Sequence, residues 1–564
     1  MDIFWTDNLN NSLFLFKKYG HWKNIRYKNI NIYFSGFCYK KKKNSYWNIT
    51  ELIEEILKKR NKLDLKNFCR ELDGHYTIVI EYKKNLLIIS DWINSKPLYY
   101  AFKENIFLLS NSPIFVKSKL INKNKNYQAM LEVLAGGYTI GDKTVYSQII
   151  KFPPGTVGYL ENGKLVKLKY TMYTPGRYSK KGLVNYKKIK KKFTNILDQT
   201  FSRLVELNHD RKMFIPLSAG LDSRLILSGI LRHGHKNITC YSYGLKGNTD
   251  TEVAKHIASK LNIPFIEMVT NPKLVRSFSK TNTFESYQNF SESYSSVSFS
   301  QDLPALYYFL KTSKIPKETL FVNGNTGDFI SGGHIPKSLK PSCGNLNIDI
   351  IRTLFLDKHY SLWNKYKSIP YRPKLEKEFD LTLYDLIDGA EKKINILNIF
   401  EIMEWYHRQV KFVISGQKVY DFLNRDWRLP LWEFPIKKFF EQLNDNYKIN
   451  QFFYKKCLLE NNWQGIWKDL PINQKNIYPI WIRPIRYYLK SLYFLIGKEK
   501  WYDLEKKYIN YWISNTSSYS LVPYSDSIFK KDVFKNPISL RSIRYLERLG
   551  LSVKDKSFKN FIDN

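Results

Sequence analysis

The change of hydrophobic period after residue 185 restricts the fold of this chain more than any other feature. Helical spacing at about 185–207 gives way to short apolar runs at 212–218, 237–244 and 263–269, and segments with helical spacing separate these runs. Strands that alternate with helices of ten or more residues lie parallel, because each helix carries the chain back to the start of the next strand. This part is therefore predicted to be a doubly wound α/β domain with a parallel sheet.

The segment before this domain has a different pattern. Between 27 and 170 it consists of short alternating or apolar runs joined by turns. Helical spacing interrupts these runs near 50–70 and near 127–135. Runs of this kind predict a mostly β domain with flanking helices.

The length of 564 residues exceeds what a single hydrophobic core supports, so at least two domains are expected. We predict a first domain at 1–180 and a second at 185–490. The remaining segment, 491–564, forms a C-terminal extension without a motif that we recognise. From about 385 onward the spacing is mostly helical.

The formal net charge of +39 would indicate a nucleic-acid or anionic membrane partner if the basic residues were clustered. They are spread instead. Runs such as Lys40–Lys43 and Lys187–Lys192 are short, and Asn, Ile and Tyr separate them. We interpret the charge as a solvated surface with a weak preference for acidic partners, and we do not expect a nucleic-acid partner.

The cysteines and the apolar stretches indicate a cytoplasmic protein. The five cysteines are odd in number, far apart and without a CxxC pair, which argues against a disulfide framework or a zinc site. The amino terminus lacks a basic stretch followed by a long apolar one, so no secretory signal is expected. The apolar stretch at 491–497 is much shorter than the roughly 18 residues of a membrane span.

The loop at 218–223, SAGLDS, carries the clearest chemistry. A loop between a parallel strand and a helix presents backbone N–H groups and the positive end of the helix dipole to an anion. Ser218 and Ser223 can add hydroxyl donors, and Asp222 can hold the magnesium that accompanies ATP. The alternative is a simple turn in which Asp222 or Ser223 caps the helix. The spacing and lysine of a Walker P-loop are missing.

The segment PLSAGLDSR at 216–224 resembles the PP-loop SGGxDS of ATP pyrophosphatases, with Ala219 in place of the first glycine. The segment 240–268 is similar to the second strand and helix of the asparagine synthetase domain. The resemblance implies that ATP is a cofactor, with adenosine beside Ser242 and Gly244 and near an acidic helix start that includes Glu252. It places the phosphates on Ser218, Ala219, Gly220, Leu221, Asp222 and Ser223. Glu252 also suits the positive end of a helix without any ligand.

A third block, FVNGNTGDFISGGH at 321–334, resembles the family loop GDGADELFGG. Gly324, Asp328 and the glycine pair before residue 334 match, whereas Asn325 and Phe329 replace an aspartate and a glutamate. The resemblance implies that Gly324 contacts the nucleotide and that Asp222 and Asp328 hold Mg²⁺, which usually keeps several water and phosphate ligands. The alternative is a glycine-rich surface turn with a solvated aspartate.

The segment 424–459 is similar to the family segment that reads roughly VEARVPFLD. Asp426 stands where the family has the glutamate proposed as the base for the incoming amine, and Glu433 replaces an aspartate. Lys475 stands where the family has a lysine over the pyrophosphate, a position where it can neutralise developing charge. The alternative for Lys475 is a solvated surface lysine.

The first domain resembles a class II glutamine amidotransferase, an Ntn-type β-sandwich, over 71–102 and 136–160. Active members need a cysteine directly after the initiator methionine, because its amine activates its own thiol. Residue 2 is Asp2, and the first cysteine is Cys38, in the middle of a predicted strand. We therefore expect a scaffold that does not release ammonia from glutamine.

The resemblance implies an AMP-forming carbon–nitrogen ligase that amidates a carboxylate through an acyl adenylate. The expected partners are a small-molecule or glycan carboxylate and ammonia, taken free or from a partner glutaminase. Two alternatives remain open: an intramolecular cyclase similar to β-lactam synthetase or lasso-peptide cyclase, and a non-catalytic or nucleic-acid-binding relative. The substrate and the oligomeric state are not predicted.

Overall fold

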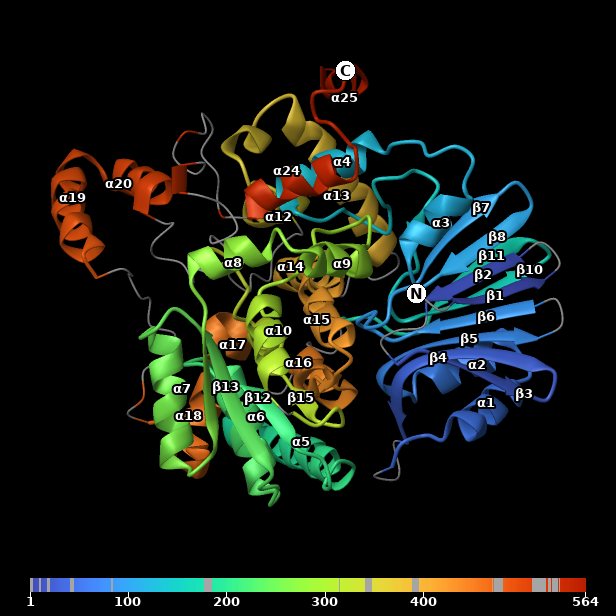
Figure 1. Cartoon of the computed structure of the whole chain (residues 1–564), viewed down its shortest axis with the longest axis horizontal. Coiled ribbons are helices and arrows are strands. Elements are labelled where there is room, and N and C mark those ends of the chain that lie inside the picture. The colour runs from blue at the N-terminus through green and yellow to red at the C-terminus, as the bar shows by residue number, and fades with distance from the viewer. Residues whose placement is uncertain are drawn as a thin grey trace.

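The computed structural model has a β-rich first domain beside a parallel-sheet domain, with a helical region above both (Figure 1). It describes residues 4–9, 12–17, 21–40, 45–82, 85–176, 185–313, 315–339, 347–387, 395–468, 470, 480–509, 524–525, 529, 536 and 538–563. The predicted boundary between the domains coincides with 177–184, which lies outside these ranges.

The first domain is a sandwich of two sheets. The six-stranded sheet is antiparallel and has the order β11 (Lys164–Lys169), β10 (Thr156–Glu161), β6 (Asn85–Ser90), β5 (Asp73–Tyr82), β4 (Ile30–Tyr39), β3 (Lys23–Tyr27). The other sheet has the order β1 (Phe4–Leu9), β2 (Ser12–Lys17), β8 (Ile106–Ser110), β7 (Tyr99–Lys103), β9 (Ile150–Lys151).

Apolar side chains at alternate positions of the strands explain why the two sheets pack together. Tyr33, Val79 and Ile88 of the six-stranded sheet share a core with Tyr100 and Leu109 of the other sheet. Successive side chains of a strand point to opposite faces, so the neighbouring positions form a second core on the outer face. That core packs against two helices, α1 (Ile49–Leu57) and α2 (Lys62–Cys69).

Local capping divides the single helical stretch expected near 50–70 into these two helices. The side chain of Asn61 accepts a hydrogen bond from the Asp64 amide at 2.9 Å and starts α2. An asparagine that caps a helix in this way favours a new start over continuation. The second predicted helix is confirmed as α4 (Tyr127–Gly136), and α3 (Pro113–Lys119) precedes it.

The second domain contains the predicted parallel sheet. Its order is β14 (Phe265–Val269), β13 (Ile238–Gly244), β12 (Met213–Pro216), β15 (Leu320–Val322), β16 (Asp426–Arg428), and all pairs are parallel. The connecting helices include α5 (Tyr186–Glu206), α6 (Leu221–Arg232) and α7 (Thr249–Lys260). A β-carbon at Gly229 of α6 would lie 2.4 Å from the Phe201 ring of α5, so glycine allows these helices to pack closely.

The rest of the described chain is mostly helical, which was predicted for the part from about 385 onward. The further helices are α8 (Pro272–Phe278), α9 (Asn282–Ser291), α10 (Leu303–Thr312), α11 (Gly327–Ile330), α12 (Ile348–His359), α13 (Tyr371–Ile387), α14 (Ile396–Glu404), α15 (Lys418–Phe422), α16 (Phe434–Gln442), α17 (Asp445–Lys448) and α18 (Phe452–Asn461). A π-helical segment, Trp405–Val413, continues α14.

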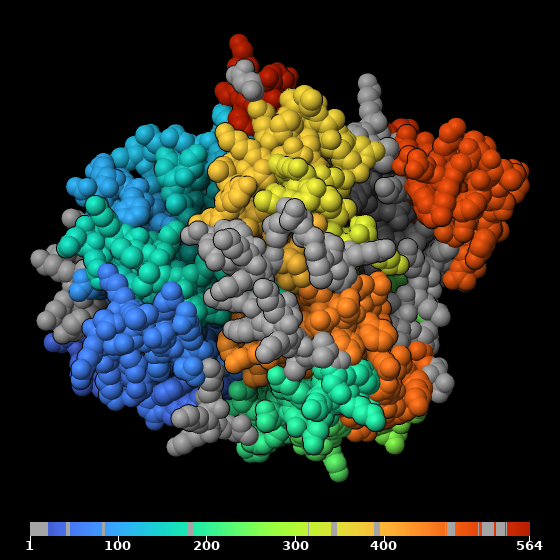
Figure 2. Space-filling model, turned by 180° about the vertical axis from the view of Figure 1, so that it is seen from behind, coloured from blue at the N-terminus to red at the C-terminus, as the bar shows by residue number. Residues whose placement is uncertain are grey.

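The C-terminal extension contributes to both the body and the periphery of the molecule. Helices α19 (Ile482–Ile496) and α20 (Lys498–Leu504) stand out from the body in both views (Figures 1 and 2). Helix α24 (Ile538–Arg548) packs against α4, and Ser539 donates a hydrogen bond to the Leu362 carbonyl at 3.0 Å. The last helix is α25 (Lys556–Asp563).

The fold class is confirmed as two domains, a β-sandwich followed by a parallel-sheet α/β domain. The first three strands, all before residue 28, were not predicted. The ranges that the structure describes contain no helix long and apolar enough to cross a membrane.

Candidate active site

The loop at 218–223 connects β12 to α6 at the carboxyl edge of the parallel sheet. The Ser218 amide donates to the Ser223 hydroxyl at 3.1 Å, and the Gly220 amide donates to the Ser218 hydroxyl at 3.1 Å. These bonds fold the loop tightly over the first turn of α6, where Gly220 is the N-cap. An anion beside this turn meets unpaired helix N–H groups and two serine hydroxyls.

Asp222 joins this loop to the loop at 323–328. One of its oxygens accepts a hydrogen bond from the Asp328 amide at 2.9 Å, and the other accepts one from the Tyr454 hydroxyl at 2.9 Å. A β-carbon at Gly324 would lie 2.8 Å from the Asp222 backbone carbonyl carbon. Glycine is therefore required for the two loops to approach this closely.

The two loops form part of the wall of a cavity of about 570 Å³ at the carboxyl ends of the strands. This is where ligands bind in open α/β sheets, since the loops there converge from several strands. The predicted residues that line it are Ser218, Gly220, Leu221, Asp222, Ser223, Ser242, Gly324 and Asp328. Other polar residues that line it include Gln301, Arg408 and Gln417.

The electrostatics of this cavity favour a cation beside Asp222. Burial and the neighbouring Asp328 carboxylate raise the pKa of Asp222 to about 7. A cation bound between the two carboxylates would offset both effects. Among the described residues no group of three or more His, Cys, Asp or Glu side chains could enclose a metal by itself. Magnesium fits such a site because it takes few protein ligands and completes its shell with phosphate and water.

Asp328 is held from the other side by His334. The His334 Nε2 lies 2.8 Å from an Asp328 oxygen, and the His334 Nδ1 contacts the buried carboxylate of Glu404. Burial opposes charge on His334, but Glu404 and Asp328 together raise its pKa to about 9. His334 is thus an imidazolium at neutral pH, and its charge helps to lower the pKa of Asp328 against the effect of burial. The Arg408 guanidinium adds a second cation 3.4 Å from Glu404.

Two predicted nucleotide residues lie behind the cavity wall. Ala219 is buried, and its amide donates to the Asp250 carboxylate at 3.2 Å. Gly244 ends β13 with a φ of +149°, and a β-carbon there would lie 2.8 Å from Asn248. Neither is among the residues that line the cavity. Their direct contacts with a nucleotide remain predictions.

Asp250, which sequence reasoning missed, is the acidic residue of α7 that lines the cavity. Glu252, which was singled out instead, is exposed and not part of the lining. The N-cap residue Asn248 could have indicated Asp250 from the sequence. Its side chain accepts a hydrogen bond from the Thr251 amide at 3.0 Å. It fixes the rotation of the first turn, so that residue 250 faces the loop. His334 and Arg408 were also missed, because they lie 74 residues apart in the sequence and only the fold brings them together.

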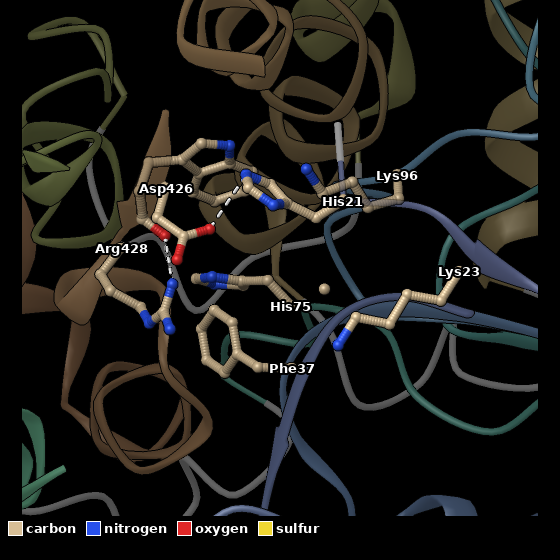
Figure 3. Close-up of a pocket in the computed structure, with 9 residues that line it drawn as sticks. His21, Lys23, Phe37, His75, Lys96, Asp426 and Arg428 are labelled. Carbon is tan, nitrogen blue, oxygen red and sulfur yellow. Dashed lines mark hydrogen bonds and ion pairs between the residues drawn. The ribbon is translucent and has the colours of Figure 1, made fainter. Parts of the chain in front are cut away.

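The two predicted catalytic residues are placed differently. Lys475 lies outside the described residues. Asp426 lines a separate pocket between the domains, shown in Figure 3, where its carboxylate lies 3.1 Å from His21 and 2.9 Å from Arg211. Burial disfavours its charge, but Arg428, His21 and Arg211 outweigh this effect and lower its pKa. Its proposed role as a base remains a prediction.

Two protein-family models match this chain, one in each domain. The family model for the glutamine amidotransferase domain matches residues 39–171, and the one for asparagine synthase matches residues 196–384. The first domain is thus similar to glutamine amidotransferase domains and the second to asparagine synthases over these residues. The loops around Asp222 and Asp328 both fall within the asparagine synthase match.

One similar curated protein is the probable asparagine synthetase (glutamine-hydrolyzing) of Acanthamoeba polyphaga mimivirus. It is 25% identical over 219 residues, which are 37% of this chain and 37% of that protein. The similarity thus spans well under half of the relative.

Two solved structures are similar at low scores. The allosteric regulatory enzyme of purine biosynthesis has a TM-score of 0.19 at 8% identity and covers 45% of this chain and 63% of its own. Glutamine phosphoribosylpyrophosphate amidotransferase from B. subtilis complexed with ADP and GMP has a TM-score of 0.18 at 10% identity and covers 54% of this chain and 58% of its own. TM-scores this low carry no argument about either domain.

Proposed function

We propose that this protein is an AMP-forming ligase that uses ATP to convert a carboxylate into an amide through an acyl adenylate. The asparagine synthase match and the cavity beside the loop at 218–223 support an amidation of the asparagine synthase kind. The observation that carries the proposal is the meeting of Asp222 and Asp328 across two loops at the start of α6.

These carboxylates fit the metal that accompanies the triphosphate. They stand next to the α6 N-terminus, so phosphate groups on the helix N–H groups would be within reach of a cation on the carboxylates. Asp222 and Asp328 would hold magnesium in this position, where it would neutralise charge on the phosphates. The helix dipole and the serine hydroxyls orient the same phosphates and need no rearrangement during the reaction.

The proposed reaction has two steps. An oxygen of the substrate carboxylate attacks the α-phosphorus, the bond to the bridging oxygen breaks, and pyrophosphate leaves. An amine next attacks the acyl carbon, loses a proton, and displaces AMP. Arg408, at the cavity wall beside His334, is placed to bind an anionic group of the substrate. The amide product, AMP and pyrophosphate account for all reactant atoms apart from the protons released.

We further propose that the nitrogen is ammonia that the first domain does not produce. Cys38, Cys69, Cys240 and Cys457, the cysteines in the described ranges, are all buried. Burial and the nearby Asp91 and Asp73 carboxylates raise the pKa of Cys38, which keeps it a thiol. A buried thiol is a poor nucleophile. The amidotransferase match begins at residue 39, so it supports the fold of this domain and not a working nucleophile.

The test is pyrophosphate release from MgATP across a panel of carboxylates: aspartate, uronic acid sugars and small peptides that carry their own amine. Each is assayed with ammonium, with glutamine, and without added nitrogen. We expect release with one class of carboxylate and ammonium, and AMP in equal amount. Release of ADP and phosphate would contradict the acyl adenylate, and turnover with glutamine in place of ammonium would contradict the inert first domain.

A further inference from the structure

A pocket outside the ATP cavity lies where the first domain meets the second. It is lined by His21 and residues of β3, β4 and β5 on one side and by β16 on the other (Figure 3). Its volume is about 160 Å³. Pockets for drug-sized ligands measure about 300–1,000 Å³, so this one suits a small metabolite and not a nucleotide.

His75 lies in the centre of this pocket and has unused hydrogen-bonding groups. The residue is 1% exposed, and both of its ring nitrogens lack a hydrogen-bond partner in the described part of the chain. A buried polar group without a partner is costly and uncommon. Burial, together with Arg428 and Lys96, lowers the pKa of His75 to about 3, so the ring is neutral. A neutral imidazole offers one donor and one acceptor to a ligand.

The backbone holds this ring in place. Gly36 of β4 has a φ of +97°, and a β-carbon there would lie 1.9 Å from the His75 carbonyl oxygen. The two strands therefore touch at this point, and the His75 ring packs on the other side against Trp427 of β16 at a centroid distance of 5.6 Å. Strands of both domains thus form most of the pocket, and His21 and Lys96 complete it from a turn and a bend.

The charges around the pocket are unbalanced toward positive. Lys23, Lys96 and Arg428 line it together with one carboxylate, that of Asp426. Lys96 is paired with Asp421, with distances of 2.8 and 2.9 Å to its two oxygens. Asp426 forms an ion pair at 2.9 Å with Arg211, a residue that does not line the pocket.

Among the described residues neither Lys23 nor Arg428 forms an ion pair with a carboxylate, although Arg428 is near enough to Asp426 to lower the pKa of that group. Lys23 is exposed at the edge of the first domain, and the Arg428 guanidinium stacks 4.0 Å from the Phe37 ring. The Arg428 Nε has no hydrogen-bond partner among the residues described. In Figure 3 Lys23 and Arg428 approach His75 from opposite sides.

We propose that this pocket binds a small oxyanion, a carboxylate or a phosphate, with Lys23 and Arg428 as its charged partners and the His75 ring N–H as a neutral donor. The ligand accepts a hydrogen bond from the imidazole N–H and offsets the excess positive charge. Because residues of both domains line the pocket, the bound anion links the six-stranded sheet to β16. This site is separate from the proposed ATP chemistry and does not depend on it.

The proposal is tested by isothermal titration calorimetry of the full chain with inorganic phosphate, with succinate, and with sodium chloride at matched ionic strength. A saturating non-cleavable ATP analogue with magnesium is present, so that the ATP cavity does not contribute. Saturable binding of phosphate or of succinate supports the proposal and identifies the source of the oxyanion. No saturable heat with either anion overturns it.

The matched variants are Lys23→Glu and Lys164→Glu. Both lysines are exposed on the same six-stranded sheet, but Lys23 is on the edge strand β3 and Lys164 on the opposite edge strand β11. We expect Lys23→Glu to weaken binding about tenfold or more, because it replaces a charge-assisted contact by repulsion. Lys164→Glu retains wild-type affinity. Equal loss in both variants indicates a general charge effect and overturns the assignment.

The variant His75→Asn tests the centre of the pocket without changing the charge of the protein at neutral pH. The smaller side chain removes the ring N–H at the centre of the pocket and leaves Lys23 and Arg428 unchanged. We expect phosphate or succinate binding to be lost while the melting temperature without ligand stays close to that of the wild type. If the His75→Asn protein has a lower melting temperature than the wild type, the comparison of Lys23→Glu with Lys164→Glu decides the proposal. Wild-type affinity in a folded His75→Asn protein contradicts the site.

Discussion

Replacing Asp222 by asparagine should stabilise the ligand-free protein while it abolishes pyrophosphate release. The side chain is partly buried, and burial plus the Asp328 carboxylate raise its pKa from 3.8 to about 7. Asparagine has a similar shape and can keep the bonds to the Asp328 amide and the Tyr454 hydroxyl. The variant therefore removes a charge and little else.

The sign and size of the effect follow from linkage. The folded state holds the Asp222 proton more tightly than the unfolded state, so this group destabilises the fold increasingly as pH rises from 3.8 to about 7. At about 1.36 kcal/mol per pKa unit, the advantage of the asparagine variant should grow by about 2–3 kcal/mol between pH 5 and pH 8. For a chain of 564 residues this corresponds to about 2 °C in melting temperature, because the entropy of unfolding is about 2.1 cal/mol/K per residue.

The assay is differential scanning fluorimetry of wild type and Asp222→Asn at several pH values, with and without MgATP. Asp210→Asn, an exposed aspartate just before β12, is the control and should not change the melting temperature. MgATP should stabilise the wild type and not Asp222→Asn. A variant that is less stable than wild type by the same amount at pH 5 and pH 8 would refute the reasoning, because it would show that the charge does not oppose folding.

Three further changes test the neighbours of this aspartate. Gly324→Ala places a methyl group 2.8 Å from the facing loop and should destabilise by about 1–3 kcal/mol and abolish pyrophosphate release; wild-type rates would contradict the close approach. His334→Gln removes the cation that lowers the pKa of Asp328, so the acid limb of pyrophosphate release should move to higher pH; an unchanged profile would contradict this pairing. Asp250→Ala should weaken ATP binding about tenfold in calorimetry, while the exposed control Glu252→Ala should not; the reverse order would favour the sequence-based choice.

The sequence by itself determined the periodic elements and the position of the loop at 218–223. Hydrophobic period and cap residues act within about one helical turn or a few strand residues, so they can be read from the chain directly. The parallel strands and the loop that contains Asp222 were predicted in this way. The first strands, Phe4–Leu9 and Ser12–Lys17, were missed because the polar stretch TDNLNN between their apolar residues does not alternate.

Only the tertiary structure decided which side chains meet. His334 contacts Glu404 across 70 residues, and Asp426 faces the first domain beside His21 instead of the cavity beside Asp222. Nothing local distinguishes such residues from solvated ones, since their environment is supplied by distant segments. Burial and charge pairing therefore arise only after the sheets pack, and they determine both the proton on Asp222 and the cationic pocket around His75.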